Sequence, residues 1–139
     1  MKINEVEKLL DVPMATIRFY EKEGLLAPQR NANSYRDYSE RDVQLIKKII
    51  VFRKIGISVE DIKWILDDKL SLQDALSKNI FSLQEKMKEL DGAIKLCMEM
   101  QENDQRNDAF DTDHYWNMIH KEEEGGNKFF EIMNDVIPP

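Results

Sequence analysis

The chain is poor in residues that several common kinds of protein require. It has one cysteine in 139 residues, so it has no intramolecular disulfide framework, and we expect a reducing cytoplasm. No apolar segment follows Met1, as it would in a signal peptide, and no hydrophobic run approaches the roughly 20 residues that cross a bilayer. We therefore expect a cytoplasmic protein that has no membrane partner.

Motifs for catalysis and for metal binding are also missing. The sequence contains no glycine-rich phosphate loop, no nucleophile elbow and no paired acid and base, so we do not expect an enzyme. A thiolate metal site needs more than the single Cys97, and an iron–sulfur cluster needs four cysteines. His114 and His120 are six residues apart, which places them on different faces of a helix. The sequence predicts neither a metal ion nor a cofactor.

The net charge of −7 is distributed unevenly along the chain. Residues 1–78 hold 14 Lys and Arg against 13 Asp and Glu, a net +1, whereas residues 79–139 hold 6 against 14, a net −8. Within residues 14–54 the count is 9 against 5, a local +4. Attraction to phosphate depends on charge at the contact surface, so a basic N-terminal face is compatible with an acidic remainder.

Two short amphipathic helices are predicted at the N-terminus. The first, Lys2 to Leu10, carries an apolar stripe, and Asp11-Val12-Pro13 ends it because proline disfavours a helical conformation in the residue before it. The second runs from Met14 to about Gly24 and has one face that carries two cations and an aromatic ring. Two short helices with a tight break are typical of a helix-turn-helix whose second helix reads the DNA major groove. The stripe of the first helix comprises Ile3, Val6, Leu9 and Leu10.

A β-hairpin is predicted directly after the second helix. Two short strands, about 29–30 and 35–38, flank the turn-rich segment Asn31-Ala32-Asn33-Ser34. A hairpin in this place is a wing, which can reach the DNA backbone or the minor groove beside the helix. Arg30 and Arg36 supply charge, and Tyr35 and Tyr38 supply hydroxyls for phosphate. The alternative is that a tyrosine packs the hairpin onto the core, which we expect for one of the two.

Three ordered segments carry a specific resemblance. They are Thr16-Ile17-Arg18-Phe19-Tyr20-Glu21, Gly24-Leu25-Leu26 and Tyr35-Arg36-Asp37-Tyr38-Ser39, and together they closely resemble the N-terminal module of the MerR family of transcription regulators. Two positions depart from the family pattern. Ser34 stands where the wing turn usually has glycine, and Ala15 stands where many members have a longer polar residue.

The resemblance implies a sequence-specific, homodimeric regulator of transcription. Such a protein binds a pseudopalindromic promoter whose spacer is too long and distorts it, so that RNA polymerase can use it. We assign Arg18 and Arg36 to phosphate or groove contacts. Thr16, Phe19 and Tyr20 are assigned to positioning and base-edge contact, and Lys22 and Tyr38 to the DNA backbone. The full set of predicted DNA contacts is Ala15, Thr16, Arg18, Phe19, Tyr20, Lys22, Arg30, Tyr35, Arg36 and Tyr38.

Two further helices complete the predicted DNA-binding domain. Ser39 and Ser58 are N-cap candidates for helices that carry buried residues up to Ile55 and Leu66. We place the winged helix-turn-helix domain at 1–69. Residues 70–103 then hold a short connecting helix, capped by Ser71, and a longer helix. Residues 104–139 form an acidic, partly helical tail.

The longer helix carries a heptad seam over nearly three repeats. A helix with this much apolar surface is unstable alone in water, so it must pack on something. Packing against its own N-terminal domain is one possibility. The resemblance favours another, an antiparallel coiled coil with the same helix of a second copy. The seam residues are Ile80, Leu83, Met87, Leu90, Ile94 and Cys97.

Four aromatic side chains make the tail a candidate effector site. Tyr115, Trp116, Phe129 and Phe130 have the chemistry to line a pocket for a small apolar or cationic ligand, with acidic residues nearby. The alternative, which we favour, is that they dock the tail onto the dimer core. At the level of the whole chain, a DNA-binding regulator competes with a ligand receptor or protein-interaction module whose activity resides in the tail.

Overall fold

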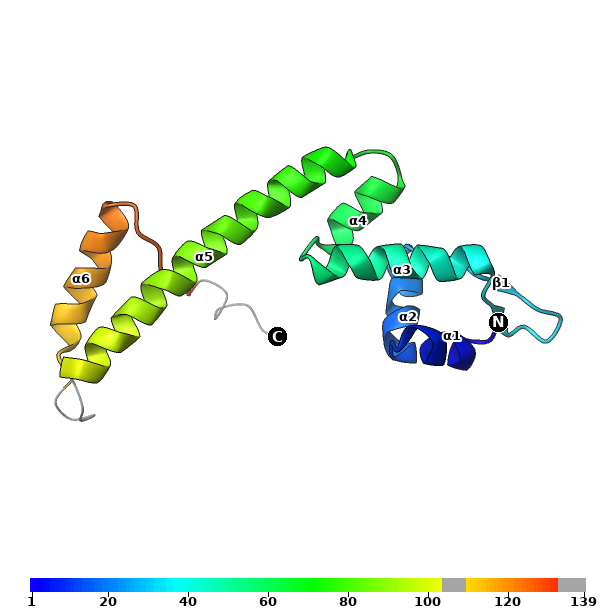
Figure 1. The fold of residues 1–139 in the computed structure, drawn as a ribbon, viewed down its shortest axis with the longest axis horizontal. Helices are drawn as coiled ribbons and strands as arrows, with labels where there is room; N and C mark the ends of the chain where they lie inside the picture. Colours follow the sequence, from blue (N-terminus) through cyan, green and yellow to red (C-terminus); the bar gives the residue numbers. More distant parts are fainter. Residues whose placement is uncertain (104–109, 133–139) are drawn as a thin grey trace. The chain divides into compact units, whose positions relative to one another are not determined.

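The computed structural model describes residues 1–103 and 110–132. This part of the chain forms six helices and one two-stranded sheet, in the order drawn in Figure 1. The predicted fold class, mostly helical with a long helix after the helix-turn-helix region, is confirmed. None of the helices in the described ranges is both long and apolar enough to span a membrane. The chain divides into two compact units, Met1–Asn79 and Ile80–Pro139.

The first unit begins with the predicted helix-turn-helix. Helix α1 spans Ile3–Leu10 and ends at Asp11, whose φ of 53° is left-handed. Helix α2 spans Met14–Lys22 and follows Pro13 directly. The first free N–H of α2, that of Met14, donates to the Glu7 carboxylate of α1 at 2.8 Å. A side chain of the first helix therefore caps the second, which fixes the angle of the turn.

The predicted hairpin follows. Strand β1 spans Gln29–Arg30 and strand β2 spans Arg36–Asp37, and they pair antiparallel with Gln29 opposite Asp37. The Asn31 side chain organises the turn, because its Oδ1 accepts hydrogen bonds from the backbone N–H groups of Asn33 and Tyr35. Ser34 has a φ of 66°. The turn thus keeps the left-handed geometry that usually calls for glycine, although serine pays a steric cost there.

Helices α3, Glu40–Lys54, and α4, Val59–Leu66, close the unit. Both predicted N-caps are confirmed: the Ser39 and Ser58 hydroxyls accept from backbone N–H groups three residues on, each at 3.1 Å. Each such cap contributes about 1 kcal/mol. These helices pack against the helix-turn-helix and complete two adjoining hydrophobic clusters. The first contains Val6, Ile17, Leu26, Tyr38, Val43 and Ile46, and the second Tyr20, Leu25, Ile49, Phe52, Ile57 and Ile62.

One apolar prediction within this unit is wrong. Leu9 was placed on the buried stripe of α1, but its side chain is exposed. Val6 is fully buried, and Ile3 and Leu10 pack partly against the same cluster. At about 100° per residue, Leu9 lies at the edge of the stripe, about 60° from Val6 and about 120° from Ile3, so it stays outside the cluster that buries Val6.

Helix α5 spans Leu72–Asn103 without interruption. The short connecting helix predicted for 70–78 is therefore not separate, and its cap residue Ser71 starts the whole of α5 by accepting from Asp74 N–H at 3.1 Å. At 1.5 Å per residue, 32 residues give a helix about 48 Å long. Its first turns belong to the first unit, where the Lys78 ammonium pairs with Asp61 of α4 at 3.0 Å.

In the second unit, helix α6, Thr112–Glu124, runs alongside the later part of α5 (Figure 1). Asp111 caps it by accepting from His114 N–H at 3.2 Å. The segment after α6 then crosses α5 at Gly92, where an added Cβ would collide with the Lys128 carbonyl oxygen. The Lys128 ammonium pairs with Glu85 of α5, which lowers the pKa of Glu85 and raises that of Lys128.

Candidate nucleic-acid interface

The outer face of α2 carries exposed side chains of the kinds that contact DNA. Ile17 and Tyr20 are buried and anchor the helix to the unit, whereas Ala15, Arg18 and Phe19 are exposed. Lys22 is exposed at the last turn, and Thr16 is half-buried. The predicted division of α2 into an inner apolar face and an outer face with two cations is therefore present in the structure.

The burial of Tyr20 corrects its predicted role. Of its two predicted roles, positioning and base-edge contact, burial supports the first: the side chain lies in the second hydrophobic cluster with 6% of its surface exposed. Ile49 and Phe52 of α3 and Ile62 of α4 belong to the same cluster. Tyr20 therefore positions α2, and we remove it from the contact set.

The predicted role of Tyr38 is corrected for the same reason, its burial. It was assigned to the DNA backbone, but it is 1% exposed and belongs to the first hydrophobic cluster. Burial raises the pKa of Tyr38, the Glu21 carboxylate adds to the rise, and Arg36 and Arg18 oppose it. Of the two wing tyrosines, Tyr38 is the one that packs the hairpin onto the core. Tyr35, at 69% exposed, remains available for a contact.

The two wing arginines differ in how they are held. Arg30 is exposed, and its Nη1 donates to the Ser34 carbonyl oxygen across the turn at 2.9 Å. Arg36 is half-buried, and its Nε donates to Glu21 Oε2 of α2 at 2.6 Å. No sequence motif predicts this second contact, because its partners are 15 residues apart and lie in different elements.

Other cations lie on α3 away from the wing. Lys47, Lys48 and Lys54 are exposed. Arg53 donates from Nη1 to the Ile57 carbonyl oxygen at 2.8 Å, so it serves to close the turn between α3 and α4. A role in holding the fold fits Arg53 better than a role in binding phosphate.

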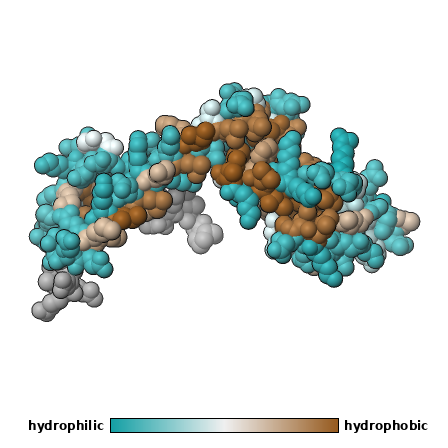
Figure 2. Space-filling view, in the orientation of Figure 1, coloured by the Kyte–Doolittle hydropathy of each residue, from teal (hydrophilic) through white to brown (hydrophobic). Residues whose placement is uncertain are grey.

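On α5, the predicted seam forms one exposed stripe. Its side chains from Ile80 to Ile94 are each between 42% and 68% exposed, and Cys97 is exposed as well. Figure 2 shows hydrophobic atoms at the surface along this helix. The opposite side of α5 carries Glu85, Gly92 and Leu96, which are half-buried beneath the tail. The part of the tail that the structure describes thus covers one side of the helix, opposite the seam.

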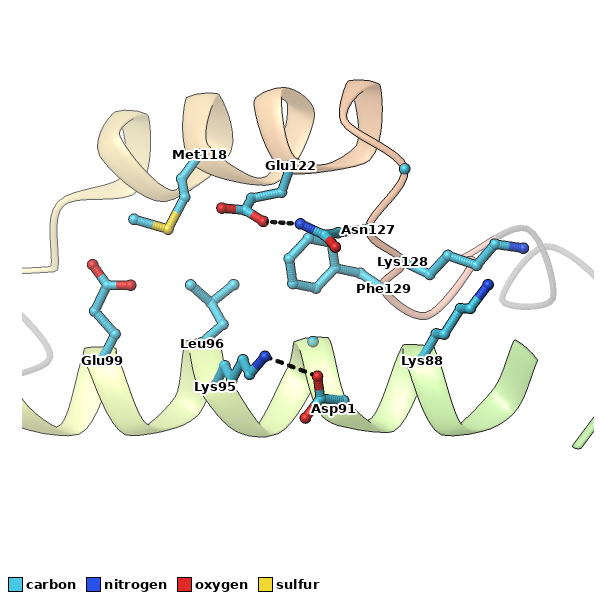
Figure 3. A pocket seen from close by; sticks show the side chains of 12 residues that line it. Lys88, Asp91, Lys95, Leu96, Glu99, Met118, Glu122, Asn127, Lys128 and Phe129 are labelled. Atoms are coloured by element: carbon cyan, nitrogen blue, oxygen red, sulfur yellow. Dashed lines mark hydrogen bonds and ion pairs between the residues drawn. The ribbon is translucent and has the colours of Figure 1, made fainter. Parts of the chain in front are cut away.

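The four aromatic residues of the tail do not share a pocket in the described part of the chain. Tyr115 is buried and stacks on Phe110, with ring centroids 5.1 Å apart. Trp116 and Phe130 are mostly exposed. Phe129 lines a cavity between α5 and α6 (Figure 3), and the other three rings do not line that cavity. Successive aromatic residues on one helix turn point in different directions, which separates Tyr115 from Trp116.

This cavity has a volume of about 400 Å³. Leu96, Met118 and Phe129 form its apolar part, and charged side chains of both signs surround it (Figure 3). Lys95 pairs with Asp91 at 3.0 Å, and Asn127 donates to Glu122. Its size falls within the range of small-molecule sites.

Comparison with known proteins assigns the chain to a family. Residues 1–69 match the description "MerR HTH family regulatory protein". The HTH-type transcriptional regulator HmrR of Rhizobium leguminosarum bv. viciae is 35% identical over 104 residues, which cover 72% of this chain and 78% of HmrR. The HTH-type transcriptional regulator ZntR of Escherichia coli (strain K12) is 34% identical over 113 residues, 78% of this chain and 79% of ZntR.

A solved structure agrees with this assignment. The transcription regulator PbrR691 from Ralstonia metallidurans CH34, in complex with lead(II), superposes with a TM-score of 0.64. It is 29% identical and covers 73% of this chain and 85% of its own. The chain has a helix-turn-helix, a wing and a long helix, and these matches cover most of its length. It belongs to the MerR family of DNA-binding transcription regulators.

Proposed function

We propose that the chain regulates transcription as a homodimer joined along α5. The observation that carries this proposal is the open seam from Ile80 to Cys97, which lies on the side of α5 away from the tail. A stripe of this length exposed to water is costly, because burial of apolar surface contributes roughly 25 cal/mol per Å². Residues 112–129 of the tail pack on the opposite side, and we infer that a second copy covers the seam. By family resemblance, the two helices run antiparallel.

In this dimer each copy presents one recognition helix and one wing to the same duplex. Two-fold symmetry matches them to the two halves of a pseudopalindrome. Helix α2 enters the major groove, where Ala15 and Phe19 can touch a thymine methyl group. The wing lies on the adjacent backbone. The proposed contacts are Ala15, Thr16, Arg18, Phe19, Lys22, Arg30, Tyr35 and Arg36.

We further propose that binding distorts a promoter in the cytoplasm so that RNA polymerase can use it. Support comes from the family resemblance. The energy needed to deform DNA depends on its sequence, so a regulator that distorts its promoter gains part of its specificity from that energy.

Selection of bound duplexes from a random pool tests the proposed symmetric dimer. The expected result is two inverted half-sites separated by a fixed spacing, with centre-to-centre distances that match a helical repeat. A single half-site, or direct repeats, would contradict the symmetric dimer.

We also propose a small apolar or cationic effector for the cavity between α5 and α6. Phe129 is retained from the predicted aromatic set, and Leu96 and Met118 join it. Titration of the chain with a hydrophobic cationic dye tests the site. Phe129→Ala should weaken dye binding, whereas Phe130→Ala, which removes a ring that does not line the cavity, should leave it unchanged. Equal effects of the two variants would contradict this location.

We do not propose a lead(II) site in this chain, although the PbrR691 structure contains lead(II). Sites built from thiolates need two or more of them or further ligands, and Cys97 is the chain's one cysteine. Within residues 1–103 and 110–132, no group of three or more His, Cys, Asp and Glu side chains is arranged to hold a metal ion.

A further inference from the structure

One ion pair connects the recognition helix to the wing in the part of the chain that the structure describes. It joins Arg36 Nε of β2 to Glu21 Oε2 of α2 at 2.6 Å. Glu21 lies in the last turn of α2, and its side chain points away from the exposed face that carries Ala15 and Phe19. The pair therefore spans the two elements that must contact DNA together.

The surroundings of this pair make it more than a surface salt bridge. The Glu21 and Arg36 side chains are 21% and 34% exposed, so solvent screens them only partly. The buried Tyr38 hydroxyl senses both charges, together with that of Arg18. Charges from α2 and from β2 thus gather around one ring of the hydrophobic core.

The geometry of the guanidinium decides what the pair does. Arginine has five N–H donors in a rigid plane, and here the carboxylate accepts from Nε. The two Nη groups, which form the fork that binds phosphate in a bidentate manner, make no hydrogen bond to Glu21. Glu21 therefore fixes the side chain of Arg36 while it leaves the phosphate-binding end available.

We propose that Glu21 is a positioning residue for DNA binding, which orders Arg36 and sets the wing against the recognition helix before the duplex arrives. This inference rests on the proposed phosphate contact of Arg36. Its benefit is entropic, because a long side chain that is already ordered loses less freedom on binding.

A double-mutant cycle on DNA affinity tests the inference. The dissociation constant for the selected duplex is measured at several salt concentrations for Glu21→Ala, Arg36→Ala and the double variant. Glu21→Ala should weaken binding by about two- to twelve-fold for each chain that binds, the equivalent of ordering one long side chain at ~0.5–1.5 kcal/mol, with an unchanged slope of log affinity against log salt concentration. Arg36→Ala should weaken binding and reduce the slope by about 0.9 for each chain that binds. The double variant should bind no more weakly than Arg36→Ala.

Two further variants control for charge and for folding. Glu23→Ala removes the same charge from the end of the same helix, but Glu23 is exposed and makes no ion pair within the described residues, so its affinity should stay equal or rise slightly. Glu21→Gln keeps an acceptor oxygen for Arg36 Nε, so its loss should be smaller than that of Glu21→Ala. Thermal unfolding of each variant, measured alongside, shows whether the first unit remains folded.

Three results would overturn the inference in distinguishable ways. Tighter binding by Glu21→Ala than by Glu23→Ala would mean that Glu21 competes with phosphate for Arg36. Unchanged binding by Glu21→Ala, with a clear loss in Arg36→Ala, would mean that Arg36 needs no positioning. An unchanged salt slope in Arg36→Ala would remove the phosphate contact itself, and with it the basis of the inference.

Discussion

Tyr38→Phe should stabilise the DNA-binding unit and leave DNA binding unchanged. The Tyr38 side chain is 1% exposed, and its hydroxyl has no hydrogen-bond partner among the residues that the structure describes. A buried hydroxyl without a partner retains the cost of its lost hydration, which is about 1–3 kcal/mol. Phenylalanine keeps the ring in the first hydrophobic cluster and removes that cost.

The expected gain in the free energy of unfolding is about 1 kcal/mol, at the lower end of that range because loss of the oxygen leaves a small gap. The unit that unfolds is Met1–Asn79. For a domain of 60–100 residues, 1 kcal/mol corresponds to a rise in Tm of roughly 4–8 °C. A shift of this size is easily resolved by thermal unfolding followed by circular dichroism.

Tyr35→Phe is the matched control, because it makes the same chemical change in the same hairpin. Tyr35 is 69% exposed, so its hydroxyl is hydrated and its loss should leave Tm unchanged. If Tyr35 contacts phosphate as proposed, its variant weakens DNA binding, whereas Tyr38→Phe does not. A loss of stability or of DNA affinity in Tyr38→Phe would show that the hydroxyl has a partner, and the burial argument would be refuted.

Three other variants test the remaining parts of the account. Leu90→Asp should convert the dimer to a monomer in sedimentation experiments, because it places a carboxylate in the middle of the seam; an unchanged mass would show that the seam is elsewhere. Arg18→Ala should weaken DNA binding and lower the slope of affinity against salt, so an equal slope would exclude a phosphate contact. Gly92→Ala should make the tail more accessible to protease, because its Cβ collides with the Lys128 carbonyl, whereas Gly125→Ala should not; equal digestion would count against the crossing.

Local signals predicted most of the first unit. The Pro13 break, the hydroxyl caps of Ser39 and Ser58, and the turn residues around Asn31 each act over a few residues, and the structure contains all of them. Periodicity also separated the outer face of α2 from its inner face. Periodicity did not distinguish Tyr35 from Tyr38, because burial of a wing tyrosine depends on how α1, α2 and α3 pack around the hairpin.

Long-range contacts account for what the sequence did not reveal. The Glu21–Arg36 pair and the crossing of Lys128 over Gly92 join residues from different elements, and neither has a motif. The aromatic tail shows the same limit. Its composition left both a pocket and docking of the tail open, and the direction of each ring was not predictable; of the four aromatic residues, Phe129 lines the cavity and Tyr115 is buried.

The most direct test of the central claim is sedimentation equilibrium of the chain, free and bound to one duplex that carries the selected site. The account predicts a free species of twice the 16.4 kDa chain mass, and two chains on each duplex. A free species of 16.4 kDa together with one chain on each duplex would contradict the proposal that paired α5 helices place two reading heads on one site.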